Sequence, residues 1–240
     1  MTMLLAIDTS TRYAGVALAD EERVVASRTW HSGVNHTAEL LPAVAQLLQD
    51  RGLTVRDLAA VAVALGPGGF SALRVGISVG KGLCLAGGFP ILGVGSLDLE
   101  AFPFVGSGLP VCALLESGRT EAASALFGAN GQRLRDDRVS TAPELLEEIG
   151  QPTLFCGEGV ARWVQEIKGG LGSKAVICSP APAVRVWSLA AIARQRLDAG
   201  KVDDLATLQP QYLRMPSIGS PKQRDRAPQE SSSRSRRNRT

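Results

Sequence analysis

A strand that runs directly into a glycine-rich helix is the feature that most constrains the fold. Residues 58–64 are continuously apolar, and residues 66–83, GPGGFSALRVGISVGKGL, contain six glycines. We expect a buried strand over 58–64, a helix over 71–86 and a further strand over 90–94. Alternation of strand and helix is typical of the α/β class.

The same order of elements occurs in both halves of the chain. Hairpin strands come first, and helix and strand then alternate. In the first half, we expect strands at 4–7, 13–19 and 24–29 and a helix at 36–50. In the second half, we expect strands at 111–116, 122–127, 153–156 and 175–178. The helices of the second half are expected at 143–149, from the residue after 157–159 to 168, and at 186–199. We therefore expect two related α/β lobes, 1–100 and 101–218, with the last helix as an element that can pack back on the first lobe.

The basic character of the chain is confined to its end. The net charge is +3, but residues 219–240 hold seven cations and two anions, so the remainder is slightly acidic at −2. This Ser/Arg/Pro-rich segment has too little apolar surface to fold, and we expect a disordered tail.

The rest of the composition indicates a globular protein of the cytoplasm. No run of eighteen apolar residues and no signal-peptide pattern occurs, so no membrane span is expected. The four cysteines form no Cys-x-x-Cys pair, which favours buried free thiols in a reducing compartment.

The glycine stretch permits two interpretations. It does not match the phosphate-binding pattern Gly-x4-Gly-Lys-Ser/Thr, because Lys81 is followed by Gly82. The turn glycines Gly66 and Gly68 remain candidates for holding a phosphate at a helix N-terminus. The glycines within the helix, Gly76, Gly80 and Gly82, indicate close packing of the helix against a neighbour, and the first two lie one helical turn apart on one face.

A second candidate anion site follows the first strand. Asp8, Thr9, Ser10 and Thr11 combine a carboxylate with three short hydroxyl side chains at a tight connection. Such a turn can hold a phosphate or a magnesium-bound water. The alternative is an ordinary turn, since these residue types favour turns in any case.

The segment around residues 36–50 carries two apolar stripes where a surface helix needs one. One stripe is Leu40, Val44 and Leu47, which we expect to face the sheet. The second stripe is expected to face outward and to be covered by the other lobe or by another subunit; it consists of Ala38, Leu41, Ala45 and Leu48.

Several of these segments together resemble the TsaB (YeaZ) family. They are Ile7–Thr11, the run from Gly66 to Gly76, His36-Thr37 with Leu40-Leu41-Pro42, and Pro210-x-Tyr212-Leu213-Arg214, so the resemblance covers about residues 3–214. It implies the two-lobed actin-like ATPase fold (ASKHA, ribonuclease H-like). It also implies a non-catalytic scaffold that activates TsaD, which transfers threonylcarbamoyl to adenosine 37 of tRNA.

The resemblance also implies the partners. They are a TsaD-type subunit bound through the helix at 36–50, a TsaE-type ATPase, and tRNA reached through the complex. A homodimer through the same helix is the alternative when TsaD is missing. No cofactor is implied beyond weak nucleotide binding at Asp8–Thr11, Gly66 and Gly68.

The chain departs from its catalytic relatives at one place and from its own family at another. Ser96 and Glu100 stand where TsaD has two metal-binding histidines, so we expect no metal site and no catalytic residues. In the second half, Glu116 and Glu158 replace the aspartates usual in the family and are as readily turn or capping residues.

Three other functions stay open at this stage. An ATP-dependent small-molecule kinase would need a catalytic aspartate and a complete second phosphate loop. A metallopeptidase would need the missing histidines. A stand-alone RNA-binding protein would depend on the basic tail alone.

Overall fold

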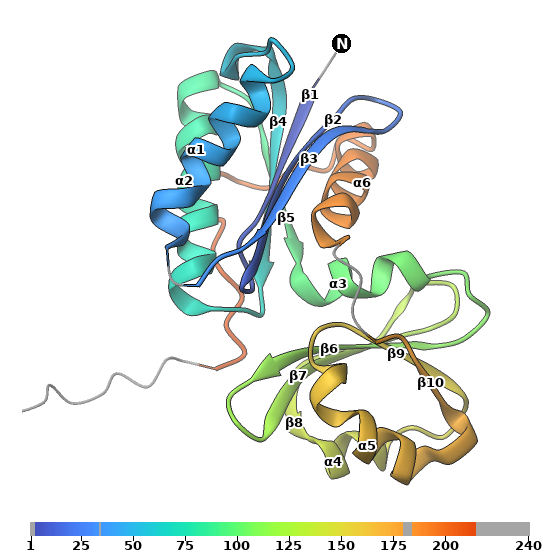
Figure 1. Cartoon of the computed structure of the whole chain (residues 1–240). Helices are drawn as coiled ribbons and strands as arrows, with labels where there is room; N and C mark the ends of the chain where they lie inside the picture. The colour runs from blue at the N-terminus through green and yellow to red at the C-terminus, as the bar shows by residue number, and fades with distance from the viewer. Residues whose placement is uncertain (1–2, 34, 180–183, 215–240) are drawn as a thin grey trace, which may run out of the picture.

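The chain folds into two halves, each built on a mixed five-stranded sheet (Figure 1). The structure is a computed structural model that describes residues 3–33, 35–179 and 184–214. The tail expected to be disordered, residues 219–240, lies outside the described residues. The strand orders are β3-β2-β1-β4-β5 and β10-β9-β6-β7-β8, so the described halves repeat one topology, as the sequence predicts.

The first sheet combines an antiparallel meander with two parallel additions. Strand β1 pairs with β2 in antiparallel and with β4 in parallel orientation, and β4 pairs with β5 in parallel. The strands are β1 (Met3–Asp8), β2 (Tyr13–Ala19), β3 (Val24–His31), β4 (Leu58–Gly66) and β5 (Ile91–Gly95). Strand β4 is buried along its length because helices cover both faces of this sheet.

The side-chain alternation of the first sheet fills two cores. Leu5 and Val63 point to one face, under helices α1 (His36–Gln49) and α2 (Phe70–Gly87). Ala6 and Ala62 point to the other face, under α6 (Arg185–Asp198). Figure 1 shows α1 and α2 on one side of the sheet and α6 on the other.

The second sheet carries shorter helices. Its strands are β6 (Val111–Ser117), β7 (Glu121–Phe127), β8 (Arg133–Thr141), β9 (Thr153–Cys156) and β10 (Ala175–Ile177), with helices α4 (Ala142–Leu146) and α5 (Val160–Leu171). Helix α3 (Ser96–Ala101) joins the two halves and contributes Leu97 to the core against β6. Three short 3₁₀ helices span Val55–Asp57, Phe102–Phe104 and Gly172–Lys174.

The chain returns to the first sheet near its end. Helix α6 packs there through Val186 and Leu189. After it, Asp203 accepts the Gly93 N–H at 2.7 Å and pairs with Arg196 at 3.0 Å. The boundary expected near residue 100 falls within α3, and the division of the chain into domains there stays a prediction.

Two of the three helix glycines are packing positions, as the sequence predicts, but the prediction for Gly82 is wrong. A Cβ on Gly76 would collide with the Thr9 hydroxyl, and one on Gly80 would lie 2.6 Å from Val63. A Cβ on Gly82 would meet nothing within 4 Å, since this residue is exposed. The glycines at 76 and 80 therefore let α2 lie directly on the sheet.

By length and composition alone, α2 could cross a membrane, with 18 residues and a mean hydropathy of 1.2. The sequence analysis expected no such segment. In the fold, Ile77 and Cys84 of this helix belong to the core beside β4.

The outward face of α1 is narrower than predicted. Ala38, Leu41 and Ala45 are exposed, but Leu48 is 4% exposed and belongs to the core, so the prediction for Leu48 is wrong. The cause is the chain that follows the helix: Leu53 donates its N–H to Leu48 O and packs on the same cluster.

Candidate functional site

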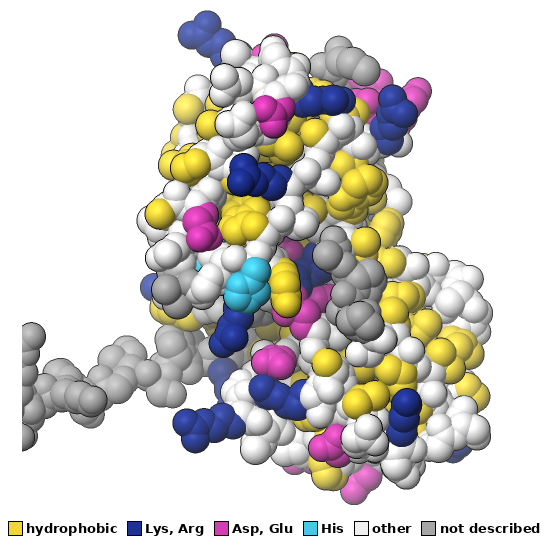
Figure 2. Space-filling view, viewed as in Figure 1, with side chains coloured by type: hydrophobic (Ala, Val, Ile, Leu, Met, Phe, Trp, Pro, Cys, Tyr) yellow, Lys and Arg dark blue, Asp and Glu magenta, His cyan; other side chains and the backbone are white. Residues whose placement is uncertain are grey.

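A cleft of about 1190 Å³ lies between the two halves of the described chain. The first half contributes the turn after β1, the end of β3 and the glycine turn before α2. The second half contributes Leu115, Glu116 and Glu158. Figure 2 shows the molecule hollowed at this level, with basic, acidic and histidine side chains gathered at the opening.

Arg185, the first residue of α6, lies in the wall of this cleft and is 6% exposed. Its Nε donates to Asp8 Oδ2 at 2.8 Å, and its Nη1 donates to Glu100 Oε1 at 3.2 Å and to Glu158. Its Nη2 donates to Thr11 Oγ1 at 2.6 Å and to the Tyr13 carbonyl at 2.7 Å. The five N–H groups of the guanidinium thus have five acceptors.

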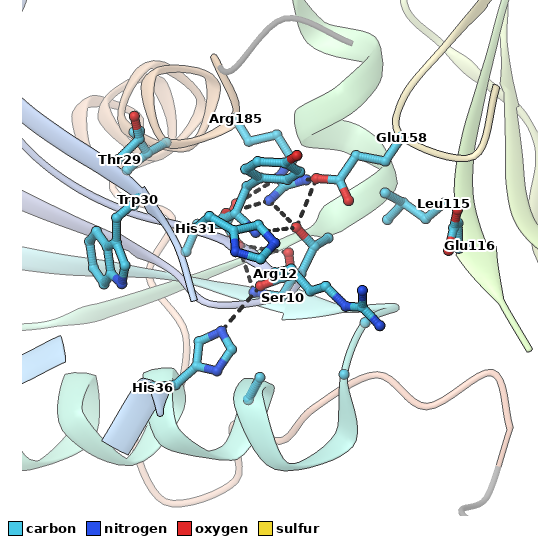
Figure 3. A pocket seen from close by; sticks show the side chains of 18 of the residues that line it. Ser10, Arg12, Thr29, Trp30, His31, His36, Leu115, Glu116, Glu158 and Arg185 are labelled. Carbon is cyan, nitrogen blue, oxygen red and sulfur yellow. Dashed lines mark hydrogen bonds and ion pairs between the residues drawn. The ribbon is translucent and has the colours of Figure 1, made fainter. Parts of the chain in front are cut away.

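These acceptors come from segments far apart in the sequence. Asp8 ends β1, Glu100 belongs to α3, and Glu158 occupies the turn between β9 and α5. In Figure 3, Arg185 and Glu158 point toward each other from opposite walls of the cleft. Glu158 also accepts a hydrogen bond from Thr11 Oγ1 at 2.8 Å, so it binds the first half twice.

Burial and charge perturb this group of residues in opposite directions. Burial raises the pKa of Glu100 to about 7, although the nearby Arg185 charge works to lower it. Burial also works to lower the pKa of Arg185, but Asp8, Glu100 and Glu158 together outweigh it and raise that pKa. Arg185 is therefore a permanent cation, whereas Glu100 exchanges its proton near neutral pH.

The turn after β1 directs its polar groups inward. Asp8 Oδ1 accepts the N–H of Ser10 at 2.9 Å and its hydroxyl at 2.6 Å. The Thr9 hydroxyl donates to Ala72 O at 2.7 Å. These groups hold the turn together and are not directed at a ligand.

The glycine turn before α2 likewise packs against other backbone segments. The Gly69 N–H donates to Ser10 O at 2.8 Å, and a Cβ on Gly68 would overlap that same carbonyl. Gly66 has φ of +107°, which favours glycine, and a Cβ there would lie 2.8 Å from Gln211 O. Close approach of backbone to backbone therefore explains these glycines.

The structure brings together part of the predicted nucleotide set. Asp8, Ser10, Thr11 and Gly68 line the cleft, whereas Thr9 and Gly66 are not among its lining residues. Nucleotide binding itself stays a prediction.

Two histidines lie along the same cleft without forming a shared site. His31 stacks edge-on against Tyr13, with ring centroids 5.2 Å apart, and His36 Nε2 lies 3.2 Å from Thr11 O. Within residues 3–33, 35–179 and 184–214, no three His, Cys, Asp or Glu side chains gather in a way that could hold a metal ion.

The two glutamates of the second half have different roles. Glu116 is 54% exposed at the side chain and pairs with Arg162 within its own half at 3.1 Å. Glu158 lies in a turn, which was one of the two interpretations, and in addition its side chain joins the two halves.

Sequence reasoning missed Arg185 as a functional residue. It lies one residue before the predicted helix start and 27 residues from Glu158. One signal was present: a cation at a helix N-terminus opposes the helix dipole and needs nearby negative charge.

Comparisons with known proteins agree on one family. The model of the family described as TsaD, tRNA N6-adenosine threonylcarbamoyltransferase, matches residues 30–215. The TsaB biosynthesis protein of Bacillus subtilis is 32% identical over 88% of this chain and 94% of its own length. A tRNA N6-adenosine threonylcarbamoyltransferase of Anaeromyxobacter dehalogenans is 33% identical, but over 59% of this chain and 50% of its own length.

A solved structure extends the agreement to the fold. YeaZ from Pseudomonas aeruginosa superimposes with a TM-score of 0.72 and 27% identity, covering 89% of this chain and all of YeaZ. The predicted two-lobed ASKHA fold is thus confirmed. On its length, its sequence and its fold, the chain belongs to the TsaB (YeaZ) branch of the TsaD family.

Proposed function

We propose that the chain is a non-catalytic partner that activates a TsaD-type transferase in the synthesis of tRNA N6-threonylcarbamoyladenosine at position 37. The observation that carries the proposal is the match along 94% of a protein named for this biosynthesis. By contrast, the transferase relative matches over only half of its length.

The chemistry of the cleft supports a role without catalysis. A carboxylate that acts as a general base must be able to reach substrate. Asp8 is 1% exposed, and both of its oxygens are bonded, one to Ser10 and the other to Arg185. The same commitment of Asp8 weighs against the small-molecule kinase, and we infer that nucleotide binding is weak at most.

The outward face of α1 is the surface that we assign to the TsaD-type partner. Leu41 is 53% exposed and lies between the exposed small residues Ala38 and Ala45. Small side chains beside a leucine let a second helix approach closely. A second copy of this chain would use the same face when the partner is absent.

The wider setting follows from the same proposal. A TsaE-type ATPase completes the assembly, and tRNA reaches this chain through the complex. Three of the four cysteines are buried, and all four are free thiols, which supports a location in the reducing cytoplasm.

The test compares two exposed leucines. Leu41→Asp places a charge on the proposed interface, whereas Leu134→Asp changes a leucine of β8 that is 46% exposed. Burying a carboxylate instead of a leucine should weaken association with a purified TsaD-type subunit about ten- to hundredfold. Formation of modified adenosine by the reconstituted enzymes should fall in parallel.

The control variant Leu134→Asp should bind and activate like the wild type, and circular dichroism should show both variants folded. Light scattering of the chain alone reports any homodimer. If Leu41→Asp binds TsaD at wild-type strength, the interface lies elsewhere. If the wild-type chain alone forms modified adenosine, the non-catalytic role is wrong.

A further inference from the structure

The Arg185 cluster lies where the two halves of the molecule meet. Arg185 begins α6, which packs on the first sheet, and Asp8 ends β1 of that sheet; Glu100 belongs to the connecting helix α3, and Glu158 belongs to the second half. The cluster therefore ties the second half to the first through Glu158, which binds both Arg185 and Thr11.

The three carboxylates form a site that requires a cation. Asp8 and Glu100 are 1% and 4% exposed, and Glu158 is 24% exposed at the side chain. Buried carboxylates that converge repel each other unless a positive charge lies among them. Arg185 supplies that charge, although its place in the first turn of α6 is unfavourable to a cation by itself.

The same arrangement disfavours an anion. One guanidinium against three carboxylates leaves excess negative charge, reduced only when Glu100 is protonated. The Ser10 N–H already donates to Asp8, and the Gly69 N–H already donates to Ser10 O. An entering phosphate would thus meet three carboxylates, and these two N–H groups could not offset the repulsion.

We propose that Arg185 is a built-in latch whose guanidinium fills a cation site between the lobes and, through Glu158, holds them in one fixed relative position. This role is separate from partner binding by α1. The latch presents the two lobes to a partner in a preorganised arrangement, which reduces the conformational entropy that the lobes would otherwise lose on binding.

Other contacts across the halves limit how far the lobes can move without the latch. Leu97 and Ala101 of α3 pack on the second sheet and remain as a hinge. At another place, Arg214 of the C-terminal segment pairs with Glu121 of β7. Loss of Glu158 should therefore widen the cleft and broaden its range of openings, while each lobe stays folded.

The experiment measures a distance across the cleft in the isolated full-length chain. Spin labels are placed at Gln46→Cys in α1 and Gln165→Cys in α5, both exposed positions, with Cys178→Ser to remove the one cysteine that is not buried. We expect a single narrow distance distribution with the latch intact. Glu158→Ala should shift the distribution to longer distances and broaden it.

Glu116→Ala is the matched control. Glu116 also lines the cleft, but it pairs with Arg162 inside its own half. This variant should keep the wild-type distribution. An unchanged distribution in Glu158→Ala would overturn the proposal, and so would equal broadening in Glu116→Ala.

Chemical rescue tests the cation site itself. Arg185→Ala leaves three carboxylates around the vacated position, so its distance distribution should broaden and its melting temperature should fall. Millimolar guanidinium chloride should reverse both effects, whereas equal sodium chloride should not. If sodium chloride restores both properties as well as guanidinium does, the effect is general screening of the carboxylate charges, and a specific latch is contradicted. If Arg185→Ala does not fold, Glu158→Ala decides the question alone.

Discussion

At the scale of single residues, burial in the cleft wall changes the pKa of one carboxyl group. Glu100 contacts Arg185 at 3.2 Å and is almost fully buried. Burial raises its pKa from an ordinary 4.5 to about 7. The folded protein therefore binds more protons than the unfolded chain between these two pH values.

This difference predicts a pH dependence of stability. A raised pKa means that the contribution of Glu100 is complete below about pH 4.5 and is lost as the pH rises through about 7. Glu100→Gln removes the proton exchange but keeps a carbonyl oxygen for Arg185. The variant should gain stability relative to the wild type as the pH rises, by at most about 3 kcal/mol.

Urea unfolding of both proteins at several pH values between 4.5 and 8 measures this difference. Parallel curves for the wild type and Glu100→Gln would mean that Glu100 does not exchange its proton in this window.

At the scale of elements, α2 offers a matched pair of glycines. Alanine favours a helix over glycine by about 0.5–1 kcal/mol where space allows. Gly82→Ala should therefore stabilise the protein by that amount, because nothing lies within 4 Å of the added Cβ. Gly76→Ala should destabilise it, because the new methyl collides with Thr9. Thermal unfolding of both variants checks the prediction, and equal effects would contradict close packing at Gly76.

Helix α1 offers a matched pair of leucines. Leu48→Ala opens a cavity in the first core and should cost about 2–5 kcal/mol of stability. Leu41→Ala removes an exposed side chain and should change stability by about 0.5 kcal/mol or less. Denaturant unfolding distinguishes the two variants. If Leu48→Ala leaves the stability unchanged, the chain after α1 does not cover Leu48.

At the scale of the whole molecule, the segment that follows α6 supports the first half. Leu205 and Leu208 pack on the first core, and Asp203 binds β5 and α6. Deletion of residues 219–240 should leave the melting temperature nearly unchanged. Truncation after Gly200 removes these contacts and should lower it by several degrees. Calorimetry compares the two, and a large drop on deletion of 219–240 alone would show that the tail supports the fold.

The basic end can also be tested at this scale. If residues 219–240 contact tRNA phosphates within the complex, their deletion should weaken tRNA binding and reduce its dependence on salt, since fewer counterions are released. Fluorescence anisotropy at two salt concentrations measures both. An unchanged salt dependence would exclude the tail from the contact.

Much of the fold follows from the sequence alone because it depends on local patterns. Continuous apolar runs predicted β4 and β6, and the spacing of apolar residues predicted α2 and α6 within one or two residues. Strand β8 was missed, since RLRDDRVST has no apolar alternation and its position depends on pairing with β7. Helix α3 was also missed, because a helix of six residues gives little periodic signal.

The contacts inside the cleft could be identified only from the tertiary structure. The sequence identified Asp8 and Thr11 as a polar turn, but it could not show that both bind Arg185, which lies more than 170 residues away. It placed Leu48 on an outward stripe because a stripe does not reveal which segment of chain will cover it. Local periodicity specifies which way a side chain points along its own element. The free energy of a buried charge depends on which groups lie within a few ångströms of it. For Arg185 these groups include Asp8 and Glu158, which only the packing of the two halves brings together.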